Sequence, residues 1–237
     1  GGLGQENIKI YNTSAHVSIN AGGGDDSIEA SYGIENTIDG GAGNDIIYGA
    51  SGAGSTDTLW GGIGDDSILA SGGDATVYGG GDNDYIYHSG AGDGTLYGDM
   101  GNDTIASATG VGDQITMYGG GGNDTMTALG GGDIWFESGS GNDQAFGDAG
   151  NDTYSFGMGD NNDTFDGGLQ GSSDTDTILL DAMPQGAISG WLSLSQGSYS
   201  VDVGTGYLTL STDAMGTITL ADGSTLNFDD VEKIMWT

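Results

Sequence analysis

One nine-residue pattern returns along most of the chain and limits what the chain can fold into. It is seen in GGAGNDIIY at residues 40–48, and it brings back an aspartate every 18 to 21 residues. These aspartates are Asp26, Asp45, Asp66, Asp84, Asp103, Asp124 and Asp143. A fixed period near twenty predicts a solenoid, in which equivalent residues of successive coils form ladders about 4.8 Å apart. Because carboxylates at that spacing repel one another, the pattern also predicts cations between them.

The pattern can be written G-G-x-G-x-D-x-U-x, where U is apolar, and it recurs from about residue 21 to residue 166. Seven copies begin at residues 21, 40, 61, 79, 98, 119 and 138. An eighth copy at 147–155 follows after only nine residues, which predicts that its Asp152 lies on the opposite edge of the solenoid. A distorted ninth copy at 157–165 brings Asp163 back to the first edge.

Short segments between the copies, such as TLYG at 95–98, alternate in a way that predicts strands. Because alternate side chains of a strand face opposite sides, one residue of each strand should point inward. In one sheet these are Ile38, Leu59, Val77, Leu96, Met117 and Trp135. Facing them from the other sheet we expect Ile28, Ile47, Ile68, Ile86, Ile105, Met126, Ala145, Tyr154 and Phe165. The predicted fold is therefore all-β, a thin parallel β-roll.

The two flanks of the repeats differ from them. Residues 1–20 are predicted to form N-terminal entry strands, residues 21–166 the β-roll, and residues 167–237 a β-rich C-terminal cap over the last coil. Within the cap we expect short strands at 175–181, 191–194, 199–203, 207–211, 217–221, 225–228 and 231–236. The ADGS step at 221–224 has the composition of a hairpin turn.

The charge of the chain excludes several classes of partner. It has 35 acidic residues against two basic ones, a formal net charge of −33, and no cysteine. Nucleic acids and anionic membranes need lysine and arginine, so neither is an expected partner, whereas cations and neutral surfaces are. No apolar run approaches a membrane span, and GGLGQENIKIYN at 1–12 lacks the basic and apolar regions of an export signal. We expect a chain that is disordered without metal and folded with it.

The residue types of the pattern suit calcium. Glycines permit positive φ and turn backbone carbonyl oxygens toward one point, to which the aspartate at position 6 adds a carboxylate. Calcium accepts six to eight oxygen ligands, whereas magnesium demands strict octahedral geometry and keeps its waters. The predicted calcium-binding carboxylates are those of the nine aspartates above and of Asp133, which is spaced to pair with Asp152. Asp174 and Asp176 begin like a helix-loop-helix calcium loop that Ile178 and a missing glycine interrupt, and calcium binding by them in the cap stays an alternative. The predicted calcium-binding glycines are Gly22, Gly24, Gly41, Gly43, Gly62, Gly64, Gly80, Gly101, Gly120, Gly122, Gly139, Gly141 and Gly150.

With these motifs, residues 21–166 resemble the RTX family, the repeats-in-toxin β-rolls. The resemblance implies a right-handed parallel β-roll with calcium in its turns, type I secretion in an unfolded state, and folding on meeting extracellular calcium. The stretch ITLADGSTLNFDDVEKIMW at 218–236 resembles the end regions of such proteins.

The chain departs from the family pattern in two ways. Asp82 stands at position 4 of one copy, and Asp99 and Asp148 at position 2 of two others, where they supply extra ligands or distort the sites. On the second edge, full motifs are replaced by Asn36, Asp57, Asp74, Asp93, Asp113 and Asp133, of which Asp74 and Asp93 fall one residue early and Asp113 two. We therefore expect one edge to be filled with calcium and the other to be occupied mainly near residues 133–152.

Two further features have alternative interpretations. A row of exposed threonines is flanked by aromatic residues, and it is either a surface for sugar, ice or another copy, or simply a stacked strand surface. The row consists of Thr37, Thr58, Thr76, Thr95 and Thr116 beside Trp60, Tyr78, Tyr97 and Tyr118. His16 and His88 stand alone, without an HExxH or GxSxG motif, and are predicted to have surface or turn roles.

The leading hypothesis is a non-enzymatic, secreted calcium-binding β-roll. It would serve as a structural or adhesive module outside the cell, assembling with copies of itself at the cell surface. Two alternatives remain open: the secretion and folding part of a larger RTX hydrolase, and an accessory module that binds a neutral polysaccharide.

Overall fold

The computed structural model describes residues 4–11, 16–32, 35–52, 54–168, 174–202 and 206–237. Parts of the predicted entry segment 1–20 and of the predicted strand 199–203 lie outside these residues. The described residues contain 24 strands, one 3₁₀ turn (η1, Ile188–Gly190) and no α-helix. None of the described residues forms a helix long and apolar enough to cross a membrane.

The strands form two sheets of 12 strands each. The first sheet contains, in spatial order, β1 (Asn7–Tyr11), β3 (Ser27–Tyr32), β5 (Ile46–Tyr48), β7 (Ser67–Gly72), β9 (Tyr85–Gly90), β11 (Thr104–Ala108), β13 (Thr125–Ala128), β15 (Gln144–Phe146), β17 (Asn162–Asp166), β23 (Thr225–Asp229), β22 (Met215–Thr219) and β19 (Leu192–Gln196). The second contains β2 (Val17–Gly23), β4 (Glu35–Ala42), β6 (Thr56–Ile63), β8 (Asp74–Gly81), β10 (Gly94–Met100), β12 (Gln114–Gly121), β14 (Asp133–Ser140), β16 (Thr153–Phe156), β18 (Thr177–Leu180), β24 (Lys233–Trp236), β21 (Tyr207–Leu210) and β20 (Tyr199–Asp202).

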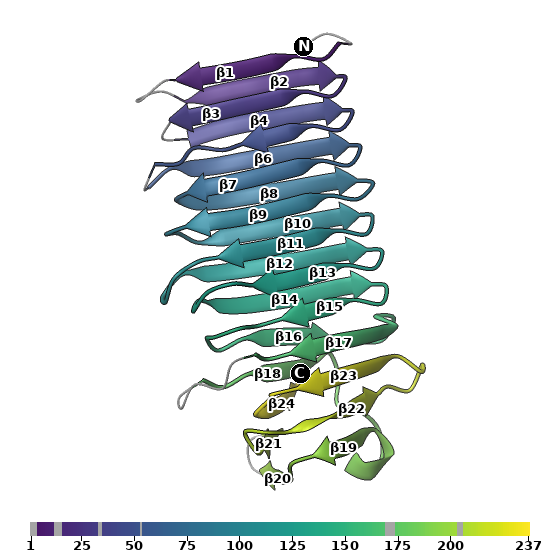
Figure 1. Cartoon of the computed structure of the whole chain (residues 1–237). Coiled ribbons are helices and arrows are strands. Elements are labelled where there is room, and N and C mark those ends of the chain that lie inside the picture. Colours follow the sequence, from purple (N-terminus) through teal and green to yellow (C-terminus); the bar gives the residue numbers. More distant parts are fainter. Residues whose placement is uncertain (1–3, 12–15, 33–34, 53, 169–173, 203–205) are drawn as a thin grey trace.

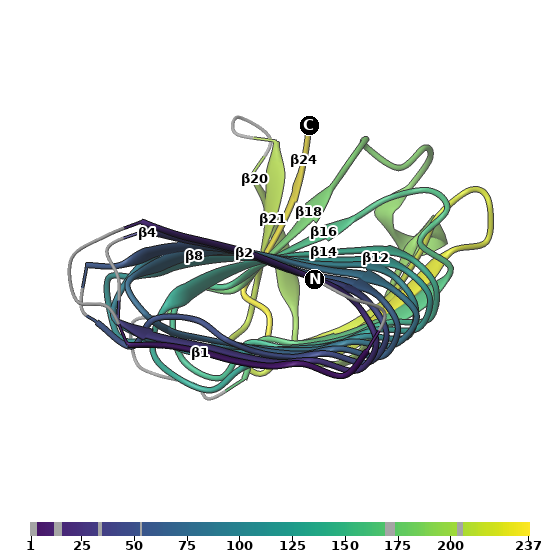
Figure 2. The ribbon, with the colours of Figure 1, turned by 90° about the horizontal axis from the view of Figure 1, so that it is seen from above.

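From β1 to β18 the chain alternates between the two sheets, and neighbouring strands within each sheet are parallel. Figure 1 shows the resulting stack of coils, with the second-sheet strands ending at the right-hand edge. We call this edge, where second-sheet strands turn into first-sheet strands, the first edge, and the opposite one the second edge. Figure 2 looks along the stack and shows two layers joined by turns, with β16, β18 and β24 fanned away from the earlier strands. The predicted all-β parallel β-roll is confirmed.

The core is a thin layer of apolar side chains in register. In the first sheet the central residues are Ile28, Ile47, Ile68, Ile86, Ile105, Met126, Ala145 and Phe165, all with 0% exposure. They are faced by Ile38, Leu59, Val77, Leu96 and Met117, which are equally buried. Burying one such aliphatic side chain contributes roughly 1.5–3 kcal/mol, so the repeated pattern supplies the apolar stabilisation of the roll. These positions agree with the prediction.

Two predicted core positions are wrong. Met117 pairs with Phe136 and not with Trp135, so Phe136 is buried while Trp135 lies on the outer face, in register with Thr116. Ile134 and Phe136 are apolar residues two apart and take the two inward positions, which leaves the residue between them outside. Tyr154 is buried as predicted, but in the second sheet beside Phe136, because its motif lies on the second edge.

The C-terminal region continues both sheets. β23 pairs parallel with β17, and β24 with β18, while β19 to β22 add antiparallel strands. The predicted hairpin at 221–224 is present between β22 and β23, where the Asp222 carboxylate accepts hydrogen bonds from Ser224. Because β1 also pairs with β3, both sheets continue across residues 20 and 166, where the domain boundaries were predicted. The division of the chain at these two residues stays a prediction.

The outer face of the second sheet carries the threonine row in register, with an aromatic stack beside it. The ring centroids are 5.8 Å apart for Trp60 and Tyr78, 4.8 Å for Tyr78 and Tyr97, and 4.7 Å for Tyr97 and Tyr118. All three pairs are nearly parallel, so the two central rings have an aromatic neighbour on each face. This arrangement agrees with the interpretation of the row as a stacked strand surface.

Candidate metal sites along the two edges

The turns of the first edge depend on glycine at positions 2 and 4 of the motif. All the glycines predicted to bind calcium have φ between 89° and 156°. A β-carbon on Gly62 would collide with the carbonyl oxygen of Gly41, the equivalent residue of the preceding coil. Asp82, Asp99 and Asp148 also have positive φ, at 75°, 71° and 65°, below the range of the glycines, and Asp99 keeps the register of its neighbours. Asp99 therefore leaves the register of its turn unchanged.

The aspartates at position 6 form a buried ladder along the first edge. In each coil the Oδ1 atom accepts a hydrogen bond from the backbone N–H of the equivalent residue in the preceding coil, at 2.7 to 2.9 Å. The residues of this ladder are Asp26, Asp45, Asp66, Asp84, Asp103, Asp124, Asp143 and Asp163, and each is at most 3% exposed. Eight of the ten predicted carboxylates are thus brought into one line.

The second carboxylate oxygen of this ladder lacks a hydrogen-bond donor. Among the described residues, the Oδ2 atoms of Asp26, Asp45, Asp66, Asp84, Asp103, Asp124 and Asp143 are buried without a partner. Asp163 differs, because its Oδ2 accepts from the hydroxyls of Tyr154 at 2.9 Å and Ser138 at 3.3 Å. A buried polar atom left unpaired costs about 1–3 kcal/mol, and more if it is charged. The ladder therefore needs protons or cations to be stable.

In five of the seven first-edge motifs a glycine at position 1 leaves room beside this oxygen, whereas Ala21 and Ser138 stand there in the other two. A β-carbon on Gly40 would meet both the Oδ2 of Asp45 and, at 2.8 Å, the carbonyl oxygen of Gly61 in the next coil. In the following coils, the equivalent carboxylate and carbonyl oxygens face Gly61, Gly79 and Gly98. Each of these coils thus offers one unpaired carboxylate oxygen and one carbonyl oxygen that face the same small space.

Burial raises the pKa of the ladder carboxyls from Asp45 to Asp163. Loss of solvent is the main cause, the backbone hydrogen bond to Oδ1 opposes it, and neighbouring carboxylates add to it. The pKa reaches about 7 for Asp66 and about 8 for Asp84. It is about 6 for Asp103, Asp124, Asp143 and Asp163. Without a cation, the folded roll therefore keeps protons on these carboxyls up to a higher pH than the unfolded chain does.

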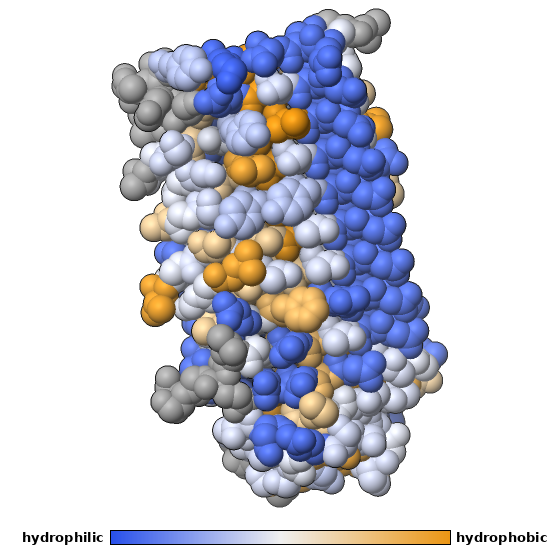
Figure 3. Space-filling model, in the orientation of Figure 1, coloured by the Kyte–Doolittle hydropathy of each residue, from blue (hydrophilic) through white to orange (hydrophobic). Residues whose placement is uncertain are grey.

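A second, exposed ladder runs along the same edge at position 5. There the side-chain oxygen accepts from the N–H of the next coil, at 2.7 to 3.2 Å, in the order Asp25, Asn44, Asp65, Asn83, Asn102, Asn123 and Asn142. Figure 3 shows the hydrophilic band that covers this edge. Asparagine serves this ladder as well as aspartate, because its side-chain oxygen accepts the same N–H, and its amide can also donate to the side-chain oxygen of the preceding coil. The charge requirement is confined to position 6.

The second edge is built differently. The residues equivalent to position 6 are Asn36 and Asp57, then four without a carboxylate, Ala75, Gly94, Ile115 and Ile134, and then Asp152 and Asp176. Both oxygens of Asp57 accept hydrogen bonds, from the Asn36 amide at 2.8 Å and from the N–H of Ala50 at 2.7 Å. The middle of this edge therefore lacks the buried carboxylates of the first edge.

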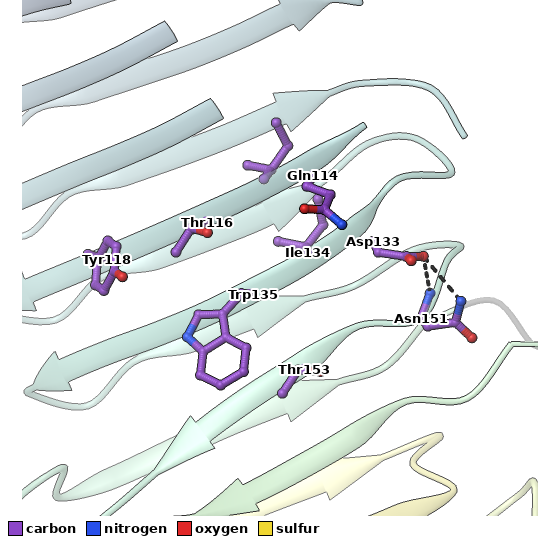
Figure 4. Close-up of a pocket in the computed structure, with 9 residues that line it drawn as sticks. Gln114, Thr116, Tyr118, Asp133, Ile134, Trp135, Asn151 and Thr153 are labelled. Carbon is purple, nitrogen blue, oxygen red and sulfur yellow. Dashed lines mark hydrogen bonds between the residues drawn. The ribbon is translucent and has the colours of Figure 1, made fainter. Parts of the chain in front are cut away.

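Asp74 and Asp93 are exposed and fall one residue early, as predicted, and Asp113 falls two early and accepts from the N–H of Gly110 at 3.1 Å. The predicted pairing of Asp133 with Asp152 is wrong. Asp133 is exposed and aligns with Asn151, whose N–H and side-chain amide donate to it at 2.8 and 3.2 Å (Figure 4).

The phase of the core residues explains this error. Coil lengths vary between 18 and 21 residues, so a spacing of nineteen does not fix the register. Instead, burial of Ile134 places it at the level of Asp152, and its N–H donates to the Asp152 carboxylate at 2.8 Å. Asp133, one residue earlier, is left outside.

The two histidines also differ. His16 lies on the surface, as predicted, 2.7 Å from the Glu35 carboxylate. His88 is fully buried, which the sequence did not predict, and its Nε2 is 3.3 Å from the Gly73 carbonyl oxygen. A β-carbon on Gly94 would approach its ring at 3.4 Å, so the imidazole fills space left by the missing side chain. Burial lowers the pKa of His88, which favours its neutral form.

Glu6 and Glu232, which share these ladders, were not among the predicted ligands, whereas Asp176 was considered with Asp174 as a calcium ligand in the cap. Glu6 donates its N–H to Asp26 at 2.7 Å, and within the described chain its Oε2 is buried without a partner. GGLGQENIK at 1–9 has the spacing of the motif with glutamate at position 6, and that signal could have identified it. Asp176 and Glu232 extend the second edge beyond Asp152, but neither follows a glycine motif.

Calcium suits the chemistry of the first edge. Among the described residues, no place gathers three or more histidine, cysteine, aspartate or glutamate side chains. Any ion must therefore combine carboxylate oxygens with backbone carbonyls, which are ligands that calcium accepts in variable number. The unpaired Oδ2 atoms and the side-chain-free glycines beside them fit this requirement.

Comparison with protein-family models matches the RTX calcium-binding nonapeptide repeat to residues 35–55, 51–86, 86–111, 116–134 and 135–162. These segments include the first-edge turns from Asp45 to Asp143 and the second-edge turn at Asp152. Together they cover just over half of the chain. A search of the curated proteins gave no match.

Proposed function

Because the chain belongs to the RTX calcium-binding repeat family, we propose that it is a structural module whose folding is driven by calcium. The ions would be held by the Oδ2 atoms of the first-edge ladder together with the carbonyl oxygens of the turn glycines. Calcium, when bound, supplies the positive charge that these oxygens lack and joins each coil to the next.

The observation that carries this proposal is the repetition of one unpaired, buried carboxylate oxygen per coil. Seven such oxygens on the first edge would each cost about 1–3 kcal/mol when left unpaired, and more when the carboxylate is ionised. The whole stability of a typical domain is only about 5–15 kcal/mol. A metal-free roll with ionised aspartates is therefore unstable, and metal binding becomes part of the folding free energy.

We further propose secretion in an unfolded state, followed by folding outside the cell. Extracellular calcium modules commonly bind with dissociation constants of about 10⁻⁴–10⁻³ M, so a chain of this kind stays unfolded where free calcium is scarce. The composition supports this, because −33 charges keep the unfolded chain soluble, and no cysteine requires oxidation.

The module is proposed to be structural or adhesive, with no catalytic activity of its own. HExxH and GxSxG motifs are absent from the sequence, and the family is generally a calcium-binding scaffold. The alternative role, as the folding part of a larger hydrolase, is tested by reading the gene upstream for either motif. Assembly between copies is tested by measuring molecular mass in solution at several calcium concentrations.

Circular dichroism and calcium titration test the central proposal. The chain should lack β structure in chelator and gain it cooperatively on adding calcium, whereas magnesium at the same concentration should have little effect. Asp103→Asn should raise the calcium midpoint, because it replaces the Oδ2 oxygen by a donor. Asn102→Asp, in the neighbouring exposed ladder, is the matched control and should leave the midpoint nearly unchanged. A spectrum that is already β-rich in chelator and indifferent to calcium contradicts the proposal.

A groove on the second sheet favours a second candidate function, the binding of a neutral polysaccharide. It has a volume of about 350 Å³ and is lined by Tyr118 and Trp135 together with Gln114 and Asn151 (Figure 4). Aromatic faces and amide groups are suited to the apolar and hydroxyl surfaces of a sugar ring. Trp135→Ala should abolish glycan binding. Tyr78→Ala should not, because Tyr78 is stacked between Trp60 and Tyr97 and does not line the groove. Absence of any bound neutral glycan in an array excludes this function.

A further inference from the structure

A short carboxylate ladder on the second edge lies where the repeats meet the C-terminal region. The Oδ1 of Asp176 accepts from the N–H of Asp152 at 2.9 Å, and Glu232 Oε2 accepts from the N–H of Asp176 at 2.9 Å. This is the hydrogen-bond arrangement of the first edge, here on the second edge. Residues 176 and 232 lie beyond the matched repeats, which end at residue 162, so no nonapeptide motif assigns them a role.

The space beside these carboxylates has the same build as the first-edge sites. A β-carbon on Gly147 would meet both the Oδ2 of Asp152 and the carbonyl oxygen of Gly167. One coil further, a β-carbon on Gly167 would meet the Oδ2 of Asp176 at 2.6 Å and the carbonyl oxygen of Asp230. The pairing of one carboxylate oxygen with one carbonyl from the next coil, seen at Gly40, is thus repeated twice at this junction.

An independent observation indicates that a ligand is missing from this place. Asp152 is 0% exposed, and among the described residues its Oδ2, which points into the space beside Gly147, has no hydrogen-bond partner. Asp176 is only 6% exposed. The two basic residues of the chain are engaged elsewhere, since Lys9 pairs with Glu29 at 2.6 Å and Lys233 lies 4.5 Å above the Tyr207 ring. Positive charge must therefore come from outside the chain.

We propose that a calcium ion binds at this junction, between Asp152 and Asp176, and holds the C-terminal region onto the roll. The proposal rests on the proposed function as a calcium-binding module and extends it to residues outside the repeats. The three carboxylates come from the β15–β16 turn, the segment before β18 and the turn before β24. An ion shared by the first two, with Glu232 fixing the backbone of Asp176, links segments that are 24 and 56 residues apart in sequence.

The test is to replace Asp176 by asparagine in the full chain. Native mass spectrometry should show one bound calcium fewer than in the wild type at saturating calcium. Hydrogen exchange should become faster in β18 and β24, while β7 to β11 stay protected. Asp213→Asn removes a charge from an exposed aspartate of the same region and is the matched control, which should leave both readouts unchanged.

A milder variant covers the case in which Asp176→Asn disrupts the C-terminal region altogether. Glu232→Gln keeps an oxygen for the N–H of Asp176, and should raise the calcium concentration needed to protect β24 by about tenfold or more. An unchanged ion count in Asp176→Asn, or faster exchange in β24 without loss of an ion, overturns the proposal. Failure of the proposed function is distinguishable, because the wild type would then bind no calcium and show no calcium-dependent protection of β7 to β11.

Discussion

In the absence of metal, protons should replace calcium and fold the roll in acid. Six carboxyls of the first-edge ladder, from Asp66 to Asp163, have folded-state pKa values of about 6 to 8, above the ordinary value of 3.8, because burial disfavours their ionised form. A group with a raised folded-state pKa stabilises the folded chain fully below its unfolded pKa, and that contribution is lost as the pH rises through the folded value. The metal-free roll should therefore be stable near pH 3.5 and lose stability between about pH 4 and pH 8.

The size of the effect follows from the pKa values. Raising the pKa of a carboxyl from 3.8 to about 6 on folding lowers the folding stability by about 3 kcal/mol once the group is ionised, at about 1.36 kcal/mol per pKa unit. Asp103, Asp124, Asp143 and Asp163 together then cost about 12 kcal/mol, which equals the stability of a typical domain. Ionisation of the ladder at neutral pH is therefore sufficient to unfold the roll when calcium is removed.

Circular dichroism from pH 3 to pH 8 in calcium-free buffer measures this directly. Because the isoelectric point is about 4.1, dilute samples and light scattering are needed to exclude precipitation. Asp65 and Asp66 provide a matched pair, since Asp65 is exposed in the outer ladder and Asp66 is buried. Asp66→Asn should shift unfolding to higher pH, whereas Asp65→Asn should not. A chain that stays disordered at every pH, or equal shifts in the two variants, would refute the reasoning.

Three further predictions concern individual positions. Gly79→Ala should raise the calcium midpoint, because its β-carbon would meet the Asp84 carboxylate and the Gly98 carbonyl oxygen, whereas Gly81→Ala, whose β-carbon has its nearest neighbour at 3.9 Å, should not. Phe136→Ala should destabilise the calcium-loaded protein by about 3–5 kcal/mol in denaturant unfolding, and the exposed-face variant Trp135→Ala by much less; equal losses would contradict the register of β14. Glu6→Gln should weaken calcium-dependent protection of β1 and β3 in hydrogen exchange while leaving β9 and β11 unchanged, and uniform protection in the variant would show that Glu6 binds no ion.

Much of the roll follows from the sequence because its repeats reinforce one another. Aspartate at position 6, glycine at positions 2 and 4, and an apolar residue two places after the aspartate recur together, and each copy fixes the phase of the next. The first-edge ladder, the buried isoleucine rank and the cap strands were therefore predictable from spacing and alternation alone.

The predictions from the sequence were wrong where a coil departs from the repeated pattern. The pairing of Asp133 with Asp152 relied on a spacing of nineteen, but burial of Ile134 and Phe136 sets the register of β14 and moves Asp133 outside. Glu6 was missed because glutamate stands where the pattern expects aspartate. Burial of His88 depends on the space beside Gly94, a packing detail that alternation along one strand does not encode.

Anomalous diffraction from calcium-loaded crystals would test the central claim most directly, because it locates each calcium ion independently of the protein atoms. We expect a row of calcium peaks along the first edge, beside the Oδ2 atoms from Asp45 to Asp143, and none beside Ala75, Gly94 or Ile115 on the second edge. A first edge without peaks, or peaks confined to the exposed position-5 ladder, would contradict the account.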